Sequence, residues 1–301
     1  MKRRNTDTVI LGFAGVRLHP EAVRGQETLS LPYDCLTPVI DRSLRRHPDN
    51  AIHFEEPHGK YAVAKRSWNR LKASGRLLAD TTSYYLLVER VGKVRRVGLL
   101  ALLDLAKTAH IWPHEQTFDK YVNERKEHLS RSGLNLSPIF LIAEDRRRRL
   151  LDVLDGLYHQ RQRLPLAGAH PRNSFDGTKR DLYLVDEEPW FSRVQAALAP
   201  DAGFLVADGH HRFKAALTLR RAGRIRHALC YVTSSRSNVS ILRKHPPVPG
   251  LDNTGPDALL RNRKWTLSQV VAWAKSGKLL PKKTTYFYPK VPVGLVYYDG
   301  R

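Results

Sequence analysis

Apolar and polar residues follow one another in short segments that predict a mixture of helices and strands. The spacing of apolar residues from Tyr61 to Ala73 predicts an amphipathic helix that ends at Gly75. The β-branched and aromatic residues of 83–90 and 96–105 predict a hairpin that turns near Gly92. Because strands and helices do not alternate strictly along the chain, the pattern favours the α+β class, with mixed sheets and flanking helices.

The rest of the chain divides into further short elements. A region rich in Pro, Gly, Arg and Asn at 161–180 predicts a flexible connection between an N-terminal α+β part, 1–160, and a C-terminal part, 181–301. The two parts are also compatible with one continuous domain. The other predicted elements are strands at 8–15, 138–143, 181–185, 204–207 and 226–233, helices at 121–130, 146–158, 188–198, 211–222 and 266–275, a loop at 235–263 and a β-rich tail at 284–298.

The composition supports a globular protein with a buried core. Of the 301 residues, 42% are apolar, which suffices for one large domain or two smaller ones. No window approaches the roughly 18 consecutive apolar residues of a membrane-spanning helix. Cys35 and Cys230 are too few for a disulfide framework or a cysteine-rich metal site. We therefore expect a soluble, cytoplasmic protein without a membrane partner.

The charge is strongly basic. Lysine and arginine number 51 and aspartate and glutamate 29, which gives a net charge of +22. This balance favours polyanionic partners such as nucleic acids or phosphorylated small molecules, although a solvated arginine-rich surface explains it equally well. We find neither a helix-turn-helix signature nor an alternation of aromatic and basic residues, so nucleic acid is the second choice.

The clearest chemical motif follows the predicted strand at 204–207, where Asp208-Gly209-His210-His211-Arg212 leads into a helix. Unpaired backbone N–H groups and the helix dipole favour an anion at such a helix start. Gly209 lets a phosphate approach the backbone, Arg212 offers a bidentate fork, and His210 and His211 offer further donors. Asp208 is suited to hold Mg²⁺ or to accept a proton from a hydroxyl. An aspartate N-cap beside two surface histidines is the alternative interpretation.

Two weaker motifs carry further candidates. His114 and Glu115 precede a predicted helix and are suited to act as a general base or metal ligand, with Lys120 as a phosphate contact. The spacing is not that of a zinc protease, and an ordinary helix N-cap also explains it. Asp34 follows Pro32 in a turn, where a carboxylate is either catalytic or part of an Asx turn.

Taken together, these segments resemble a prokaryotic family of proteins of unknown function, numbered one thousand and fifteen. This family is a relative of the free serine kinases of the ParB/sulfiredoxin fold. The resemblance covers nearly the whole chain and rests on four motifs in order, namely 12–17 with 32–34, 114–120 with 125 and 137–140, 207–213, and 280–290 with 294–296.

The resemblance implies a ParB/sulfiredoxin-like nucleotide-binding core with elaborations. It also implies a small-molecule kinase that uses Mg²⁺ and transfers a phosphoryl group from ATP or ADP to free L-serine or a related hydroxy amino acid. It assigns phosphate binding to Gly209, His210, His211, Arg212, Lys120, Lys283 and Thr284, catalysis to Asp208, Glu115, Asp34 and His114, magnesium to Asp208 and Glu115, and further pocket positions to Tyr288 and Lys290.

Alternatives remain open at this point. The carboxylate that acts as the base is not determined, and the acceptor can differ from serine because the central region is shorter than in the family. A ParB-like nucleotide-dependent DNA-binding protein and a non-catalytic nucleotide sensor are the other candidate functions. A homodimer is also compatible with the sequence.

Overall fold

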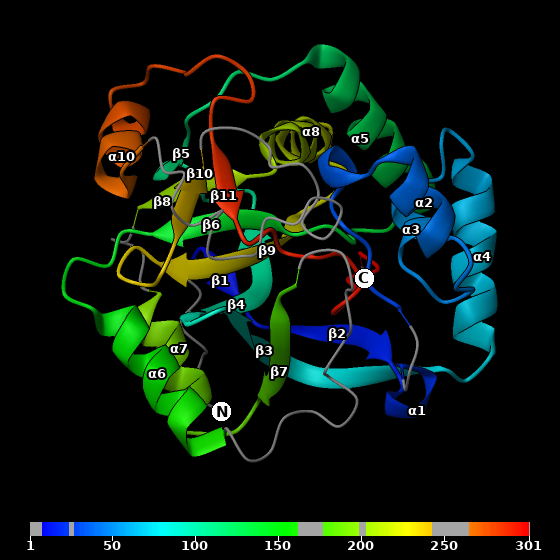
Figure 1. Cartoon of the computed structure of the whole chain (residues 1–301), viewed down its shortest axis with the longest axis horizontal. Coiled ribbons are helices and arrows are strands. Elements are labelled where there is room, and N and C mark those ends of the chain that lie inside the picture. Colours follow the sequence, from blue (N-terminus) through cyan, green and yellow to red (C-terminus); the bar gives the residue numbers. More distant parts are fainter. Residues whose placement is uncertain (1–7, 24–26, 162–176, 199–202, 243–264, 301) are drawn as a thin grey trace.

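The computed structural model of the chain describes residues 8–23, 27–161, 177–198, 203–242 and 265–300. Within these residues nine strands form one sheet in the order β2-β3-β4-β9-β6-β8-β5, with β1 paired to β4 and β7 paired to β3 (Figure 1). Their bounds are β1 Ile10–Leu11, β2 Phe13–Leu18, β3 Leu77–Val91, β4 Val94–Asp104, β5 Ile111–Pro113, β6 Ile139–Ala143, β7 Lys179–Val185, β8 Phe204–Asp208 and β9 His227–Ser234. The strands β10, Ser240–Leu242, and β11, Tyr286–Tyr288, form a separate antiparallel pair.

The large sheet is mixed. The pairs β5–β8 and β6–β9 are parallel, whereas β3 is antiparallel to β2, β4 and β7. Together with the flanking helices this confirms the predicted α+β class with a mixed sheet. The ParB/sulfiredoxin-like core stays a prediction.

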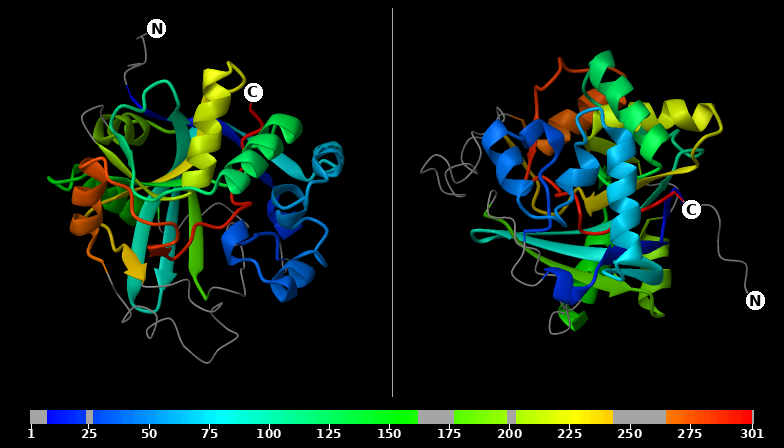
Figure 2. Two further views of the ribbon diagram at one scale, coloured as in Figure 1. Left: turned by 90° about the horizontal axis from the view of Figure 1, so that it is seen from above. Right: turned by 90° about the vertical axis from the view of Figure 1, so that its right-hand side faces the viewer.

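Helices and the tail cover both faces of the sheet. The helices are α1 Pro20–Val23, α2 Pro38–Leu44, α3 Ile52–Glu55, α4 Tyr61–Ala73, α5 Asp119–Ser132, α6 Arg149–Arg161, α7 Trp190–Ala197, α8 His210–Arg221 and α10 Leu267–Lys275. Apolar side chains of α6, α7 and α8 pack on one face, and α10 packs with the C-terminal tail on the other. Helices α2, α3 and α4 lie at the side of the sheet (Figure 1; Figure 2, right).

Coverage of both faces explains the apolar character of the central strands. On β3, Tyr84 and Leu86 belong to the core on the α6–α8 face, whereas Tyr85 and Leu87 belong to the core on the opposite face. Successive side chains of a strand point to opposite faces, so a strand buried on both sides is apolar at consecutive positions. The sheet therefore provides a rigid support for the loops at its edges.

Several predicted elements agree with the structure. The helix at Tyr61–Ala73 has the predicted bounds, and Gly75 follows it with a φ of +68°. The predicted hairpin is β3–β4, and Gly92 in its turn has a φ of +54°. Thr266 caps α10 in a reciprocal capping box with Gln269.

Other elements differ from the sequence prediction. Helices α1, α2 and α3 were not predicted, because four to seven residues form too few turns to reveal a helical period. The strand β10 lies in the predicted loop at 235–263, of which 243–263 lie outside the described residues. In the β-rich tail only β11 is a strand, and the rest joins the body through isolated bridges such as Ser30–Val293 and Val16–Tyr297.

Most of the predicted connection at 161–180 also lies outside the described residues, which resume at 177. Strands from either side of it share the large sheet, since β7 pairs with β3 and β9 pairs with β4. The division into two parts stays a prediction.

A buried ionic cluster fixes the tail against the sheet. The Arg96 Nε–H donates to the Glu89 Oε2 at 2.8 Å, and Arg180 Nε lies 3.4 Å from Glu89 Oε1. The same guanidinium groups donate to the carbonyl oxygens of Pro289, at 2.7 Å from Arg96, and Lys290, at 3.3 Å from Arg180. The backbone of Lys290 is thereby held at a defined position.

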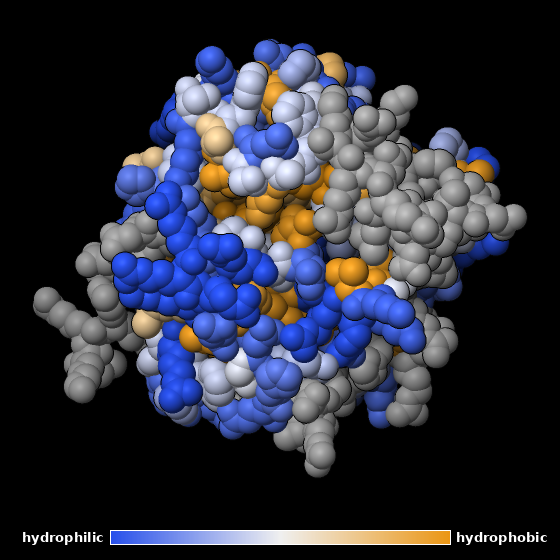
Figure 3. All heavy atoms as spheres, turned by 60° about the vertical axis from the view of Figure 1, so that its left-hand side comes forward, coloured by the Kyte–Doolittle hydropathy of each residue, from blue (hydrophilic) through white to orange (hydrophobic). Residues whose placement is uncertain are grey.

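The part of the chain that the structure describes contains no helix long and apolar enough to cross a membrane. Figure 3 shows the side that carries α10, where hydrophobic side chains form a patch between strongly hydrophilic ones.

Candidate functional site

Four separate segments meet in one pocket at the start of α8, which we call the α8 pocket. They are the turn at 33–34, residues 115–116 after β5, the β8–α8 junction and the tail at 282–290. The lining consists of Tyr33, Asp34, Glu115, Gln116, Ala207, Asp208, Gly209, His210, His211, Arg212, Lys282, Lys283, Thr285 and Lys290. The structure thus brings together motifs that the sequence alone could not place side by side.

The β8–α8 junction presents the free N-terminus of a helix. Gly209 is the N-cap, has a φ of +84°, and provides no side chain to cap the helix. A Cβ at this position would also lie 3.0 Å from Nε of Arg212. Only glycine is therefore free of strain here, and the start of α8, which lines the pocket, has no side-chain cap on its first backbone N–H groups.

Asp208, the last residue of β8, lies between two cations. Its Oδ1 pairs with Nζ of Lys290, and its Oδ2 accepts a hydrogen bond of 2.9 Å from Nη2 of Arg212. Burial alone raises the pKa of Asp208, but the charges of Lys290 and Arg212 outweigh it and hold that pKa well below its ordinary value. Asp208 is therefore ionised and fully engaged.

Lys290 connects two carboxylates. In addition to its pair with Asp208, its Nζ lies 3.8 Å from Oδ2 of Asp34. Burial lowers the pKa of Lys290, but Asp208 and Asp34 outweigh burial and hold it above the ordinary value. The ammonium group stays charged in a buried position.

Arg212 helps to orient Asp208. Its Nη1 donates to the Pro138 carbonyl oxygen at 2.7 Å, and its Nη2 donates to Asp208. Its buried Nε has no hydrogen-bond partner among the described residues. The guanidinium group thus keeps unused donors at the pocket, and its contact with phosphate stays a prediction.

Both histidines of the motif are likewise engaged inside the protein. Nε2 of His211 accepts from the Phe118 N–H at 2.9 Å, and its Nδ1 lies 3.1 Å from the Tyr33 hydroxyl. Nε2 of His210 accepts from the backbone N–H of His114 at 3.3 Å. Burial is the main cause that lowers the pKa of both rings. They are neutral groups that fix the turn, and the backbone N–H groups remain as phosphate donors.

Glu115 differs from Asp208 in its surroundings. Its Oε1 accepts from the Thr285 backbone N–H at 2.7 Å and from the Thr285 hydroxyl at 2.6 Å. Its Oε2 has no hydrogen bond to any residue that the structure describes. Burial raises the pKa of Glu115, and the hydrogen bonds from Thr285 oppose that rise only in part. A carboxylate with a raised pKa and a free oxygen in a pocket is suited to accept a proton.

His114 lies directly behind the pocket lining. Its Nδ1–H donates to the Val206 carbonyl oxygen at 2.8 Å, and its Nε2 lies 2.8 Å from Oγ1 of Thr285. Burial lowers the pKa of His114 to about 4, so the ring is neutral. His114 and Glu115 thus both approach the hydroxyl of Thr285, whose single proton is donated to the Glu115 carboxylate at the pocket.

Comparison with known proteins identifies the family. The family model described as "Protein of unknown function (DUF1015)" matches residues 10–287. The chain belongs to this family.

No curated protein matches the chain. Among solved structures, a mutant free serine kinase in complex with AMP is 14% identical and covers 68% of this chain and 97% of its own, with a TM-score of 0.33. The same kinase mutant in complex with ADP also has 14% identity and a TM-score of 0.33, with coverages of 68% and 98%. At these values no binding residue of those structures can be transferred to this DUF1015 chain.

Some predicted residues of this DUF1015 chain lie outside the pocket. Lys120 is exposed on α5, and Tyr288 is buried in β11. Thr284 does not line the pocket, because its hydroxyl donates to the Pro281 carbonyl oxygen at 2.6 Å and closes a turn. Within that turn Lys283 lines the pocket with a φ of +56°, an unusual conformation for a residue with a side chain.

Sequence reasoning missed Thr285. In extended chain, residues two apart point to the same side. Thr285 and Phe287 are two apart and both contact His114, so the alternating pattern next to Phe287 is the signal that indicates Thr285. Tyr33 and Lys282 were also not predicted as pocket residues. Their positions depend on contacts with aromatic residues that are distant in the sequence.

The residues present were also tested as magnesium ligands. No group of three or more His, Cys, Asp or Glu side chains is arranged to hold a metal in the described ranges. Both oxygens of Asp208 are engaged by cations, whereas Glu115 has one oxygen free. The side chains thus fit a Mg²⁺ held mainly by substrate phosphates, with Glu115 as its protein ligand, and do not fit a site centred on Asp208.

Proposed function

We propose that this chain is a phosphotransferase that binds ATP or ADP in the α8 pocket and phosphorylates the hydroxyl of a small molecule, with free L-serine or a related hydroxy amino acid as the acceptor. The observation that carries the proposal is the convergence of an uncapped helix start at Gly209, the lysines Lys283 and Lys290, and the carboxylate of Glu115 in one pocket. Phosphoryl transfer depends mainly on positioning and charge neutralisation, which this set of groups offers.

The helix start supports phosphate binding. The N–H groups of His210 and His211 have no side-chain cap, and Lys283 lines the same pocket. No other described residue pairs with Lys283, so its ammonium group is available to a phosphate. The αL conformation of Lys283 is the kind of strain that functional positions retain.

Glu115 is the best candidate for the base among the three carboxylates. Asp208 is unsuited, because its two neighbouring cations hold its pKa well below the ordinary value. Glu115 has a raised pKa and a free oxygen. In the proposed step the acceptor hydroxyl oxygen bonds to the terminal phosphorus, the bond from that phosphorus to the bridging oxygen breaks, and the hydroxyl proton passes to Glu115. The nucleotide leaves with one phosphate fewer.

Magnesium, bound with the nucleotide, would neutralise the phosphate oxygens. Glu115 Oε2 is the protein oxygen placed to reach it, and a carboxylate cannot serve as ligand and base through the same oxygen. The proposal therefore has two variants. In one, Glu115 binds magnesium before it accepts the proton, and in the other it accepts the proton first.

The choice of acceptor rests on the family resemblance and on charge. Asp34 offers a carboxylate for an ammonium group, and Lys283 offers a cation for a carboxylate, on either side of a pocket that also contains the candidate base. A zwitterionic hydroxy amino acid matches this arrangement.

Phosphorus NMR tests the proposal. Purified protein with Mg²⁺, ATP or ADP, and L-serine is expected to produce a new phosphomonoester signal, and Glu115→Gln is expected to abolish it. Nucleotide binding without turnover of any hydroxyl acceptor would contradict the kinase and favour a nucleotide sensor. If nucleotide does not bind, the α8 pocket is not a phosphate site.

DNA binding is a second candidate because of the net charge of +22. A gel shift on duplex DNA that weakens steeply with salt and depends on nucleotide would favour it over the kinase.

A further inference from the structure

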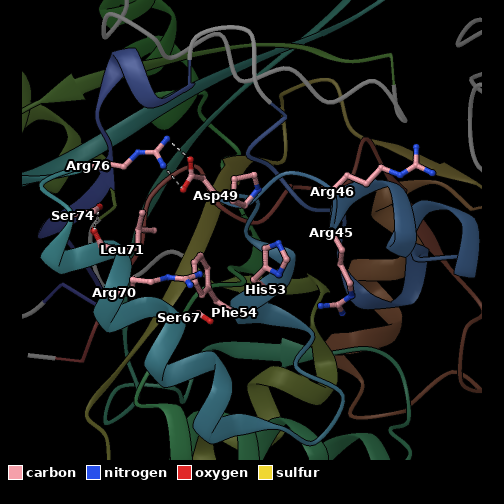
Figure 4. A pocket seen from close by; sticks show the side chains of 11 residues that line it. Arg45, Arg46, Asp49, His53, Phe54, Ser67, Arg70, Leu71, Ser74 and Arg76 are labelled. Carbon is pink, nitrogen blue, oxygen red and sulfur yellow. Dashed lines mark hydrogen bonds and ion pairs between the residues drawn. The ribbon is translucent and has the colours of Figure 1, made fainter.

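A second cavity lies away from the α8 pocket, between the α2–α3 segment and α4, and we call it the arginine cavity. Its volume is about 540 Å³, within the range of small-molecule sites. Its lining includes Arg45, Arg46, Arg70, Arg76, Asp49 and His53, none of which lines the α8 pocket. Figure 4 shows Arg70 and Arg76 on one side, Arg45 and Arg46 on the other, and His53 between them.

Two of the four arginines are used to build the cavity. Arg45 pairs with Asp41 at 2.8 Å and donates to the Glu56 carbonyl oxygen at 2.6 Å. Arg76 donates to Asp49, with its Nη1 2.9 Å from Oδ1. These contacts leave both guanidinium groups fixed at the walls.

The other two arginines have no partner among the described residues. The side chains of Arg46 and Arg70 make no hydrogen bond or ion pair there, and both are exposed at the cavity. His53 donates through Nε2–H to the His47 carbonyl oxygen at 3.0 Å, so it neutralises neither of them. Asp49 is the one carboxylate among the lining residues, and it is already paired with Arg76.

Positive charges from three segments therefore gather around one hollow. Burial is the main cause that lowers the pKa of His53, and the charges of Arg45 and Arg70 lower it further, whereas its hydrogen bond to His47 and the charge of Asp41 oppose them. An anion would relieve the repulsion between these positive charges, and planar guanidinium groups match phosphate oxygens geometrically. The buried Phe54 and Leu71 supply an apolar wall.

We propose that the arginine cavity is a binding site for a phosphorylated small molecule, whose phosphate is held by Arg70, while Arg46, whose side chain points away from His53 in Figure 4, contributes its charge at the rim. The inference does not depend on the proposed function, since it uses other residues and requires no turnover. A concave cavity of this size suits a small molecule better than the flat face that DNA or a membrane would need.

Isothermal titration calorimetry with inorganic pyrophosphate, on the full chain at low ionic strength, tests the proposal. We expect Arg70→Ala to weaken binding about tenfold, because it removes a charge-assisted contact, and Arg46→Ala to weaken it less, because it removes only a nearby charge. Matched controls are Arg66→Ala, on α4 with Arg70, and Arg42→Ala, on α2 shortly before Arg46, both of which are exposed and outside the lining. Both controls are expected to bind like the unmodified chain.

Pyrophosphate can also enter the α8 pocket, so the titration is repeated in Lys283→Ala. Binding that survives in Lys283→Ala and is lost in Arg70→Ala supports the arginine cavity. Equal losses in Arg70→Ala and Arg66→Ala would show only a general effect of surface charge and would overturn the proposal. So would an Arg70-dependent affinity for phosphatidylserine vesicles or duplex DNA in the absence of pyrophosphate binding.

Discussion

The α8 pocket and the arginine cavity are both cationic, but they differ in how the charges are held. In the α8 pocket Lys290 and Arg212 enclose the buried carboxylate of Asp208, whereas in the arginine cavity Arg46 and Arg70 are exposed and unpaired within the described residues. The pocket also contains Glu115, a carboxylate with a raised pKa, which has no counterpart in the cavity. The first arrangement suits proton transfer and chemistry, and the second suits binding alone.

The largest expected effect is on turnover. Glu115→Gln keeps the size of the side chain and removes the proton acceptor, so we expect phosphoryl transfer to fall by about 100-fold or more, in line with loss of a general base. Nucleotide affinity is expected to change little. The matched variant in the cavity, Asp49→Asn, is expected to leave turnover unchanged, and equal losses in the two variants would remove the distinction between the regions.

The next effect is on stability. Asp208→Ala leaves Lys290 buried with only the more distant Asp34, at 3.8 Å, and leaves Arg212 without its carboxylate, so we expect the free energy of unfolding to fall by about 3 kcal/mol. Asp49→Ala is expected to cost about 1 kcal/mol, because Arg76 is partly exposed to solvent. Urea denaturation measures both. The double variant Asp208→Ala with Lys290→Met is expected to recover part of the loss, and no recovery would argue against a buried ion pair.

The sequence predicted the local features of this comparison and missed the long-range ones. Asp208 to Arg212 were found because an apolar strand, a glycine turn and a helix follow one another directly in the chain. The pairing of Lys290 with Asp208 depends on Arg96 and Arg180, which hold the tail from a distant part of the sheet. Contacts between such distant segments produce no periodic pattern of residues in the sequence.

Residue types alone also left roles undecided. Asp34, Glu115 and Asp208 are equivalent as sequence candidates for the base, and burial and neighbouring charges separate them in the structure. In the same way the sequence did not show that Arg212 donates to Pro138 and Asp208, and its phosphate contact stays a prediction. The arginine cavity was not predicted, because one of its walls comes from the α2–α3 segment, whose helices are too short to be recognised, and only the α4 wall was predicted.

The pH dependence of stability should differ between fully buried histidines and His53 of the arginine cavity. Burial lowers the pKa of both His114 and His128 to about 4, so each is neutral in the folded chain while the unfolded chain takes up protons below about pH 6.5. Stability is therefore lost as the pH falls from about 6.5 to 4, by up to about 3 kcal/mol for each ring. Urea denaturation at several pH values is expected to show a shallower loss in His128→Gln. His53→Gln in the cavity is expected to change the slope less, because this ring is only half-buried.

The smallest effect concerns the helix start. Gly209→Ala and Gly223→Ala both place a side chain at positive φ, so each is expected to cost about 1–2 kcal/mol of stability. A Cβ at Gly209 would press on Arg212, whereas nothing lies within 4 Å of one at Gly223. We therefore expect only Gly209→Ala to weaken ADP binding, as measured by calorimetry, and equal affinities in the two variants would contradict a phosphate at this turn.

The most direct test of the account is a titration of isotopically labelled protein with ADP and Mg²⁺, followed through the backbone amide signals. The account predicts that the amides of Gly209, His210 and His211 shift most, because the phosphates would accept hydrogen bonds from the start of α8. Shifts confined to Arg46 and Arg70, or no shifts at all, would contradict it.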